Sequence, residues 1–254
     1  MPHKTDISIL IVTHNHGDYI AKLLNDLHRF GYTNVYICDA KSQDQTVNLL
    51  KESPYSKQIL IKDKLEGFSK NNNDLIRFFK LNTPYYLLLN PDVYLEEDFL
   101  AVLYSEMNTH SSIGIIAPMV KYPNGSVQTT WKKFPSVLQV FKKRLGLAKA
   151  IDEKQQKSGV IDWCLGACML IRSSFLKKNG NLLDERYRLY CEDVDICFEA
   201  KMCGFQVIGS DKTFVYHHLN ELSAKNIFSK YNWWNIVSIF KFALKWNYKF
   251  ICKK

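Results

Sequence analysis

The sequence of 254 residues lacks the two glycine-rich patterns that most often bind phosphates. It contains no G-x-G-x-x-G segment, which excludes the classical dinucleotide-binding fold, and no G-x-x-x-x-G-K-[ST] segment, which excludes a P-loop. It also has no C-x-x-C pair, and its seven cysteines do not follow zinc-site spacing. An odd number of unpaired cysteines is typical of a reduced set of small buried residues in a cytosolic protein.

Long hydrophobic runs are missing as well. The chain has no run of 18 uncharged apolar residues, so the sequence predicts no membrane-spanning helix. The apolar run at 7–12 is shorter than the core of a secretory signal, and no small-residue cleavage site follows it. We therefore expect the protein to be cytoplasmic.

Two segments lack acidic residues. The formal net charge is +9, and residues 107–151 and 225–254 each hold seven basic residues and no Asp or Glu. In the second segment a polar stripe with helical spacing runs through many aromatic residues: Ser238, Lys241, Lys245 and Lys249. Such a basic amphipathic helix is typical of a segment that lies on an anionic membrane, although packing on the body of the protein explains the same pattern. Nucleic-acid binding is a weaker interpretation, because no helix-turn-helix, zinc-finger or RNP motif accompanies the charge.

The sequence does contain a regular alternation of short apolar runs and amphipathic stretches. Hydrophobic residues make up 46% of the chain and charged residues 23%, which excludes a disordered or collagen-like chain. Strands are predicted at 7–13, 35–39, 58–62 and 85–89, and helices at 18–30, 44–52 and 67–79. This order predicts an α/β fold with a mostly parallel central sheet and helices on both faces. Residues 145–160 are polar without clear periodicity and are predicted to form a loop.

Polar residues follow three of the predicted strands. They form the segments Thr13-His14-Asn15, Asp39-Ala40-Lys41-Ser42 and Asn90-Pro91-Asp92. In sheets of this kind ligands bind beyond the carboxyl ends of the strands, so these segments are candidates for a binding site. A carboxylate such as Asp92 can hold Mg²⁺ or Mn²⁺ that also bridges a diphosphate, although an Asp after Pro is equally typical of a turn.

Further candidates lie in the second half of the chain. Glu192, Asp193 and Asp195 precede a helical pattern, where acids stabilise a helix N-terminus and where one of them can serve as a general base. A predicted strand at 214–216 ends in His217 and His218. Imidazole there suits a metal such as Mn²⁺, although a pair of surface or core histidines is the simpler interpretation.

The order of these motifs resembles the family 2 glycosyltransferases with the GT-A fold. The segments ILIVTHNHGDYIAKLL, EGFSKNNN, YLLLNPDV, VIDWCLGACMLIR and YCEDVDICFEAKMCG look more narrowly like bacterial rhamnosyltransferases that build O-antigen, capsule and cell-wall linker glycans. The similarity runs from about residue 7 to residue 228. It implies a GT-A domain at 1–224, with a nucleotide-sugar-binding half at 1–105 and an acceptor and catalytic half at 106–224. Residues 225–254 would form the C-terminal basic helix.

The resemblance assigns donor-binding roles residue by residue. The matching positions are Thr13, Asn15, Asp39, Gly67, Asn71 to Asn73, Asn90 and Asp92. Gly67 would let the backbone approach the ligand, and the asparagines offer both donors and acceptors. Asn90 and Asp92 stand where the family has its D-x-D metal motif, which makes Asp92 the main carboxylate for Mg²⁺ or Mn²⁺.

The same resemblance assigns the chemistry. Asp193 matches the catalytic base, with Glu192 beside it. As the metal ligand, His218 fits the family's spacing between His and Ser better than His217 does. His217 stays open as the alternative. The acceptor side would be lined by Trp163, Gly166 and Ala167. Charge alone suggests that Trp131, with Lys132 and Lys133, binds the acceptor diphosphate; the alternative for Trp131 is a loop aromatic that packs on the core.

The implied activity is inverting transfer of a sugar, L-rhamnose from dTDP-L-rhamnose, to a polyprenyl-diphosphate-linked saccharide. The enzyme would be peripheral on the cytoplasmic face of the inner membrane. UDP-GlcNAc, UDP-galactose or UDP-galactofuranose are alternative donors. An inactive homologue or a basic nucleic-acid-binding module is the alternative from another class. The sequence leaves the oligomeric state open.

Overall fold

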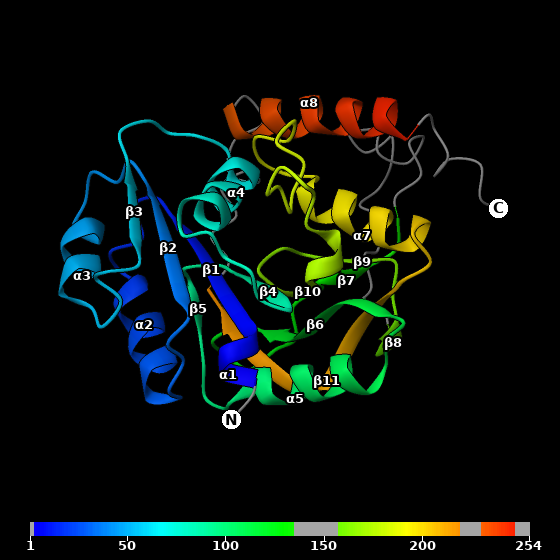
Figure 1. Ribbon diagram of the computed structural model, residues 1–254, viewed down its shortest axis with the longest axis horizontal. Coiled ribbons are helices and arrows are strands. Elements are labelled where there is room, and N and C mark those ends of the chain that lie inside the picture. Colours follow the sequence, from blue (N-terminus) through cyan, green and yellow to red (C-terminus); the bar gives the residue numbers. More distant parts are fainter. Residues whose placement is uncertain (1–2, 135–156, 219–229, 247–254) are drawn as a thin grey trace.

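A computed structural model describes residues 3–134, 157–218 and 230–246. The fold is α/β, with one large sheet between two layers of helices (Figure 1). The first half alternates strands and helices as predicted, with bounds that differ by up to two residues. Its elements are α1 (His3–Asp6), β1 (Ile7–Thr13), α2 (Ile20–Arg29), β2 (Val35–Ala40), α3 (Thr46–Glu52), β3 (Ile59–Lys62), α4 (Phe68–Phe78) and β4 (Tyr85–Leu89).

The second half adds strands of both directions to the same sheet. Its elements are β5 (Val93–Tyr94), α5 (Phe99–Thr109), β6 (Ile113–Lys121), β7 (Trp131–Lys132), β8 (Gly159–Val160), β9 (Trp163–Cys164), β10 (Cys168–Arg172), the 3-10 turn Ser173–Phe175, α7 (Glu192–Met202), β11 (Gln206–His217) and α8 (Lys230–Lys245). Among the described residues the strand order is β3-β2-β1-β4-β10-β6-β11-β5. The strand β10 runs antiparallel between β4 and β6, and β7 pairs with β9 in a small second sheet.

Strand register brings the predicted site residues to one edge. Strands β1 and β2 are parallel, with Thr13 opposite Asp39, and β1 pairs with β4 so that Ile11 lies opposite Leu89. The carboxyl ends of these three strands therefore meet at the same edge. Asn90 begins the loop that leaves β4 there. The three polar segments singled out from the sequence are thus neighbours in space.

Side chains alternate along the strands and build one hydrophobic core on each face of the sheet. Ile9 and Ile11 of β1 join the core that α2 and α5 cover, whereas Leu10 joins the core under α4 and α7. The helices supply their own apolar stripes, for example Leu23, Leu24 and Leu27 of α2. The predicted placement of helices on both faces is therefore confirmed.

Of the described cysteines, Cys38, Cys164, Cys168 and Cys197 are buried, which agrees with the prediction of small core residues. Cys203 is exposed and Cys191 is half-buried. Cys252 lies outside the described residues.

Gly67 precedes α4 and lies against the backbone of Arg188. A Cβ atom added to Gly67 would lie 2.5 Å from the carbonyl oxygen and 2.8 Å from the Cα of Arg188. The amide of Phe68 donates a hydrogen bond to that same carbonyl at 2.8 Å. The sequence suggested that Gly67 lets the backbone approach a ligand. In the structure Gly67 instead lets the backbone pack against Arg188, in the segment that leads to α7.

We expect Gly67→Ala to lower stability, because backbone atoms cannot move aside as a flexible side chain does. The cost of such overpacking is about 1–3 kcal/mol, measured as a fall in Tm and in the urea midpoint. Gly166→Ala is the matched control, since its added Cβ would lie at an ordinary 3.6 Å from the Cβ of Asp193. Equal Tm values for the two variants would contradict this account of Gly67.

The C-terminal helix α8 lies across α4 and α7 (Figure 1). The polar stripe predicted from the sequence faces the body of the protein: Ser238 Oγ donates to the carbonyl of Leu189 at 3.1 Å and Lys241 Nζ to that of Arg186 at 2.7 Å. Phe242 is buried beside them. Packing on the body, the alternative to membrane contact, therefore describes this face of α8. Lys249 lies outside the described residues, as does most of the loop predicted at 145–160.

No helix within residues 3–134, 157–218 and 230–246 is long and apolar enough to cross a membrane.

Candidate active site

The loops after β1 and β2 are joined by Ser42. Asp39 is fully buried and accepts hydrogen bonds from the Ser42 backbone N–H at 2.9 Å and from its hydroxyl at 2.5 Å. The same hydroxyl accepts from the N–H of Asn15 at 2.8 Å, and Asn15 Oδ1 accepts from the N–H of Gln43 at 2.7 Å. Asn15 has a φ of 57°, a conformation that asparagine tolerates better than most residues. Two predicted donor-binding residues, Asn15 and Asp39, thus belong to one hydrogen-bonded loop pair.

His16 is a neighbour of this loop pair that the sequence did not single out. Its Nδ1 accepts a hydrogen bond from the backbone N–H of His14 at 3.0 Å and lies 3.2 Å from the hydroxyl of Thr13. Burial lowers the pKa of His16, against the opposing charge of Asp92. A neutral ring with an occupied Nδ1 carries its proton on Nε2. His16 therefore adds a neutral N–H donor near Asp92.

Asp92 and His217 meet at the end of β4 and β11. Both are nearly buried, and Asp92 Oδ1 lies 3.2 Å from His217 Nε2. The spacing argument preferred His218 as the partner of Asp92. The structure instead leaves the His218 side chain exposed against the ring of Tyr19, with only its backbone N–H bonded to the Asp92 carbonyl at 3.1 Å. The geometry therefore favours His217.

Gln128 fixes which nitrogen of His217 faces Asp92. The side-chain amide of Gln128 donates to the His217 carbonyl at 2.6 Å, so its Oε1 is left to accept from His217 Nδ1 at 3.1 Å. With the proton on Nδ1, the lone pair of Nε2 points to the carboxylate. Gln128 is 2% exposed and lies 89 residues before His217 along the chain. No pattern in the sequence identified it.

Two electron-pair donors that face each other at 3.2 Å require a cation between or beside them, either a proton or a metal ion. Adjacent ligands at right angles around an octahedral ion, about 2.1 Å from each, lie about 3.0 Å apart. The pair Asp92 and His217 therefore fits one divalent ion, whose other positions substrate phosphates and water commonly fill. Within the described parts of the chain no group of three or more His, Cys, Asp or Glu forms a complete metal site.

The charges at this pair favour an ionised carboxylate. Burial alone would disfavour the charge of Asp92, but the neighbouring imidazole rings of His217 and His16 outweigh it and lower the pKa of Asp92. Asp92 is thus available as an anionic ligand at neutral pH.

We expect Gln128→Leu to weaken Mn²⁺ binding, because it releases the ring of His217 to rotate and to change tautomer. Loss of such a supporting hydrogen bond typically costs 10–100-fold in metal affinity. Titration calorimetry with Mn²⁺ and a nucleoside diphosphate measures it. Gln58→Leu is the control, since the Gln58 amide donates only to the Thr33 carbonyl at 2.9 Å, at the far edge of the sheet. Unchanged Mn²⁺ affinity in Gln128→Leu would exclude this role.

Asp193 lies in the first turn of α7, and hydrogen bonds link it to the loop that follows β4. Its Oδ2 accepts from the N–H of Gly166 at 3.2 Å, and its Oδ1 from the N–H of Val194 at 2.8 Å. The next residue, Ala167, accepts at its carbonyl from the N–H of Asn90 at 2.9 Å. Gly166 and Ala167 thus connect Asp193 to the loop that carries Asp92. The predicted base and the predicted metal carboxylate are thus linked through the predicted acceptor segment.

The two adjacent carboxyl groups at the start of α7 differ in environment. Burial raises the pKa of Asp193 against the opposing hydrogen bonds from Val194 and Gly166 and the charge of Lys132. Burial and the charge of Asp193 raise the pKa of Glu192 well above its ordinary value. The ionised form is therefore disfavoured more strongly at Glu192 than at Asp193, which is a half-buried carboxyl group with a raised proton affinity. A raised pKa suits a general base.

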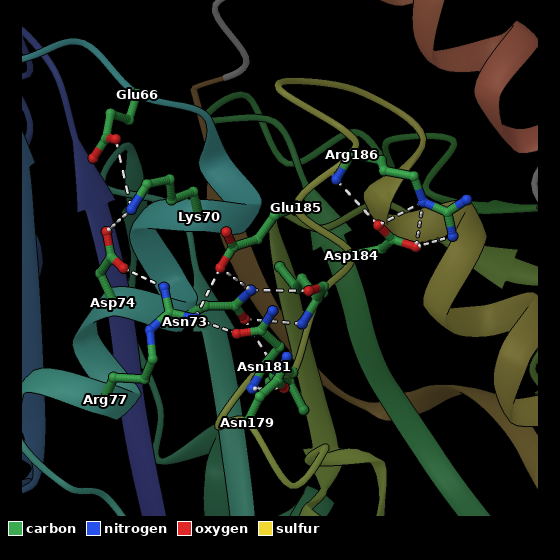
Figure 2. A network of polar contacts seen from close by, with 12 residues as sticks. Glu66, Lys70, Asn73, Asp74, Arg77, Asn179, Asn181, Asp184, Glu185 and Arg186 are labelled. Atoms are coloured by element: carbon green, nitrogen blue, oxygen red, sulfur yellow. Dashed lines mark hydrogen bonds and ion pairs between the residues drawn. The ribbon is translucent and has the colours of Figure 1, made fainter.

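The asparagines of α4 are buried and bind mainly protein groups. Asn73 Oδ1 accepts from the amides of Leu182 and Leu183 at 2.9 and 3.0 Å, and its Nδ2 donates to the Leu183 carbonyl and to Glu185. Figure 2 shows Asn73 pointing at the segment near Glu185, with Asp74 between Lys70 and Arg77 on the same helix. Protein groups occupy both the amide oxygen and the amide nitrogen of Asn73, which argues against the predicted contact with the donor. Asn71, 1% exposed, keeps an unpaired Oδ1.

Trp131 does not reach an acceptor. It is 2% exposed and packs on Gly209, whose missing side chain leaves the room for its ring. This burial overturns the prediction of an acceptor contact and matches the alternative of an aromatic residue on the core. Trp163 is half-buried, and its indole N–H donates to the carbonyl of Lys133 at 2.9 Å. The Lys132 ammonium lies 5.6 Å from the centre of the Trp163 ring. Lys132 is also close enough to Asp193 for its charge to act on that carboxyl group.

The model of the family described as Glycosyl transferase family 2 matches residues 8–180. The chain belongs to this family. Rhamnosyltransferase WbbL of Escherichia coli (strain K12) is 28% identical over 94% of this chain and 93% of its own length. An N-acetylglucosaminyl-diphospho-decaprenol L-rhamnosyltransferase of Mycobacterium tuberculosis is 27% identical over 52% of this chain and 46% of its own. This family 2 glycosyltransferase therefore resembles rhamnosyltransferases, as its motifs predicted.

Solved structures place the glycosyltransferase in the GT-A fold. The S. aureus protein TarS 1-349 in complex with UDP-GlcNAc superposes with a TM-score of 0.61 at 16% identity, over 94% of this chain and 66% of that one. The mannosyltransferase PcManGT of Pyrobaculum calidifontis, in complex with GDP-Man and Mn²⁺, gives a TM-score of 0.62 at 13% identity, over 94% and 63%. The glycosyltransferase thus spans less than two thirds of either solved chain. At such identities the likeness concerns the fold alone.

Proposed function

We propose that this glycosyltransferase transfers a sugar from a nucleoside-diphosphate donor to a hydroxyl group of a lipid-linked saccharide, with inversion at the anomeric carbon. The observation that carries the proposal is a short series of hydrogen bonds that links Asp193, the proposed base, to the loop of Asp92, the proposed metal ligand. Asp193 binds Gly166, and Ala167 binds Asn90, two residues before Asp92. A base and a site for a diphosphate-bound cation at one edge of the sheet are what a single displacement requires.

Each centre has a defined task in this reaction. Asp193 takes the proton of the acceptor hydroxyl as its oxygen attacks the anomeric carbon. Its raised pKa strengthens it for that task. Asp92 and His217 would hold a divalent ion, and such an ion would supply positive charge to the departing diphosphate. The loop pair that Asp39 and Ser42 hold together would contact the nucleoside through Asn15 and its neighbours, because it borders the same edge.

L-rhamnose from dTDP-L-rhamnose is the donor that we propose. The support comes from the two relatives above, both named rhamnosyltransferases, one of them matched along nearly its whole length. A UDP-sugar is the alternative within the same chemistry, and it is the nucleotide class bound in the TarS complex.

A panel of donors tests the proposal. Purified protein is mixed with dTDP-rhamnose, UDP-GlcNAc, UDP-galactose or UDP-galactofuranose, each with Mn²⁺, Mg²⁺ or EDTA, and with a bacterial lipid extract as the source of acceptor. We expect thermal stabilisation and release of dTDP with dTDP-rhamnose alone. Release of UDP from a UDP-sugar would keep the mechanism and replace the donor. No stabilisation and no nucleotide release with any donor, together with a salt-dependent mobility shift of duplex DNA, would favour a nucleic-acid-binding module instead.

A polyprenyl-diphosphate acceptor fits both the comparison and the outer face of α8. The mycobacterial relative is named for a decaprenol-linked substrate. On α8, Trp233, Phe240 and Leu244 are 65%, 51% and 68% exposed and follow the spacing i, i+7 and i+11, which places them on one face. We propose that this face lies on the anionic cytoplasmic surface of the inner membrane, with lysines of the C-terminal segment adding electrostatic attraction.

Trp233→Ser with Leu244→Ser should weaken membrane binding. About 25 cal/mol per Å² of apolar surface is lost when such side chains no longer enter lipid, so we expect at least a tenfold lower partition onto phosphatidylglycerol vesicles in a sedimentation assay. Phe78→Ser with Val160→Ser is the matched control, because Phe78 and Val160 are 62% and 60% exposed on other surfaces. Equal vesicle binding by the two double variants would contradict the proposal for α8.

A further inference from the structure

The helix α8 contacts the segment 184–195, which contains the proposed base Asp193. Besides the hydrogen bonds of Ser238 and Lys241 to backbone carbonyls of this segment, the Trp234 ring lies 4.3 Å from the guanidinium of Arg188. Arg188 in turn donates to the carbonyl of Leu65 at 3.0 Å. The segment is thus held between the start of α4 with its preceding loop on one side and α8 on the other.

The strongest of these contacts converge on Asp195, two residues after Asp193. Asp195 is 1% exposed. Its Oδ2 accepts from Lys245 Nζ at 2.5 Å, and its Oδ1 accepts from the indole N–H of Trp246 at 2.8 Å and from the hydroxyl of Tyr187 at 3.0 Å. Three donors therefore saturate this carboxylate, and two of them come from the C-terminal end of the chain.

Lys245 also links Asp195 to the start of the segment. Its ammonium lies 3.0 Å from Asp184 Oδ2, and the same carboxylate pairs with Arg186, as Figure 2 shows. These donors outweigh the burial of Asp184 and hold its pKa well below its ordinary value. One lysine thus ties both ends of the segment 184–195 together.

The backbone that these contacts enclose is strained. Tyr190 and Cys191 have φ angles of 70° and 69°, in the left-handed region that residues other than glycine rarely adopt. They immediately precede Glu192 and Asp193 in the chain. Strained conformations of this kind persist only where surrounding contacts hold them, and they gather at functional sites. Here the contacts of α8 surround the strained pair.

We propose that Lys245 is a positioning residue for the glycosyl transfer, acting through Asp195 to hold the first turn of α7 so that the carboxylate of Asp193 faces the acceptor hydroxyl. Lys245 does not touch the reacting atoms. Its ammonium fixes Asp195, Asp195 fixes α7, and the strained turn before Glu192 is thereby kept from relaxing. The inference rests on the proposed function, since it assigns a role within that reaction.

Lys245→Met tests the inference in the full-length protein, assayed with the donor that the wild type uses. We expect kcat to fall at least tenfold while the KM and Kd for the donor stay within twofold, because Lys245 pairs with Asp184 and Asp195 and not with the loops of Asn15 and Asp39. Lys245→Arg should recover most of the kcat, since a guanidinium can bridge the same two carboxylates. Lys212→Met is the matched control: it removes the ion pair of Lys212 with Glu106, 3.0 Å long, on α5 and should keep the wild-type kcat.

The outcomes are distinguishable. A wild type that transfers no sugar would refute the proposed function itself. An active wild type with equal kcat in Lys245→Met and Lys212→Met would overturn the positioning role alone, as would a matching rise in the donor KM. If Lys245→Met does not fold, Trp246→Phe decides, because it removes only the indole donor to Asp195 and keeps a ring. A several-fold lower kcat in Trp246→Phe at unchanged donor KM supports the inference, and a wild-type kcat overturns it.

Discussion

Asp193→Asn is expected to lower kcat by about 10³-fold, the size of effect that loss of a general base produces. The amide keeps the shape of the side chain, and its one oxygen can still accept from the N–H of Gly166 or of Val194, which bond two different oxygens of Asp193. Because one backbone hydrogen bond is retained, the fold should persist and the donor Kd should change little. Quenched-flow or steady-state release of the nucleoside diphosphate gives kcat, and titration calorimetry gives the donor Kd.

Glu192→Gln is the control for this variant. Burial and the charge of Asp193 raise the pKa of Glu192 and disfavour its ionised form, so a neutral amide at this position should cost far less activity. If Asp193→Asn kept more than a tenth of the wild-type kcat, or if Glu192→Gln lost as much, Asp193 would not be the base.

The pH dependence follows from the same group. A base works in its deprotonated form, and burial raises the pKa of Asp193, so activity should fall on acidification through a pKa above the ordinary value of about 3.9. Lys132 opposes that rise. Lys132→Met should therefore move the acidic limb of kcat to higher pH.

Asp92→Ala is expected to abolish the metal dependence of donor binding. The variant removes the anionic ligand of the pair and leaves the lone pair of His217 Nε2 without its partner at 3.2 Å. A neutral imidazole alone binds Mn²⁺ or Mg²⁺ weakly, because these ions prefer oxygen ligands. The donor Kd measured with Mn²⁺ should then equal the Kd measured in EDTA.

The matched control for Asp92→Ala is Asp98→Ala. Asp98 caps α5, where its side chain accepts from the N–H of Ala101, and its loss should cost stability without changing the effect of Mn²⁺. Wild-type Mn²⁺ enhancement in Asp92→Ala would exclude Asp92 as a metal ligand and would leave His217 as a structural histidine.

The first half of the fold could be predicted because its signals are local. Each apolar run and each helical stripe lies within one element, and parallel strands bring their carboxyl ends to one edge without further information. For that reason the sequence alone correctly predicted that one edge of the sheet carries Thr13, Asp39 and Asn90. The antiparallel β10 was not predicted, because its pairing with β4 and β6 depends on residues far apart in the chain.

The choice between His217 and His218 had a usable signal. The sequence predicted a strand at 214–216, whereas β11 continues to His217. Alternation along the strand buries Thr213, Val215 and His217 and leaves His218 exposed. Extending the strand by one residue would have selected His217, which the His-to-Ser spacing did not.

Other parts of the site carried no signal within the sequence. Gln128 meets His217 across 89 residues, and Lys245 meets Asp195 across 50. Asn73 looked like a donor-binding amide, yet the amides of Leu182 and Leu183 occupy it. Such assignments depend on which polar atom a neighbour satisfies, and only the assembled structure determines that.

The configuration of the product tests the central claim most directly. The donor that responds in the panel is incubated with the lipid extract, the lipid-linked product is isolated, and its anomeric configuration is read from the C1–H coupling in its NMR spectrum. A single displacement with Asp193 as base predicts the anomer opposite to that of the donor. A product with the donor's own configuration would require a second displacement and would contradict the account.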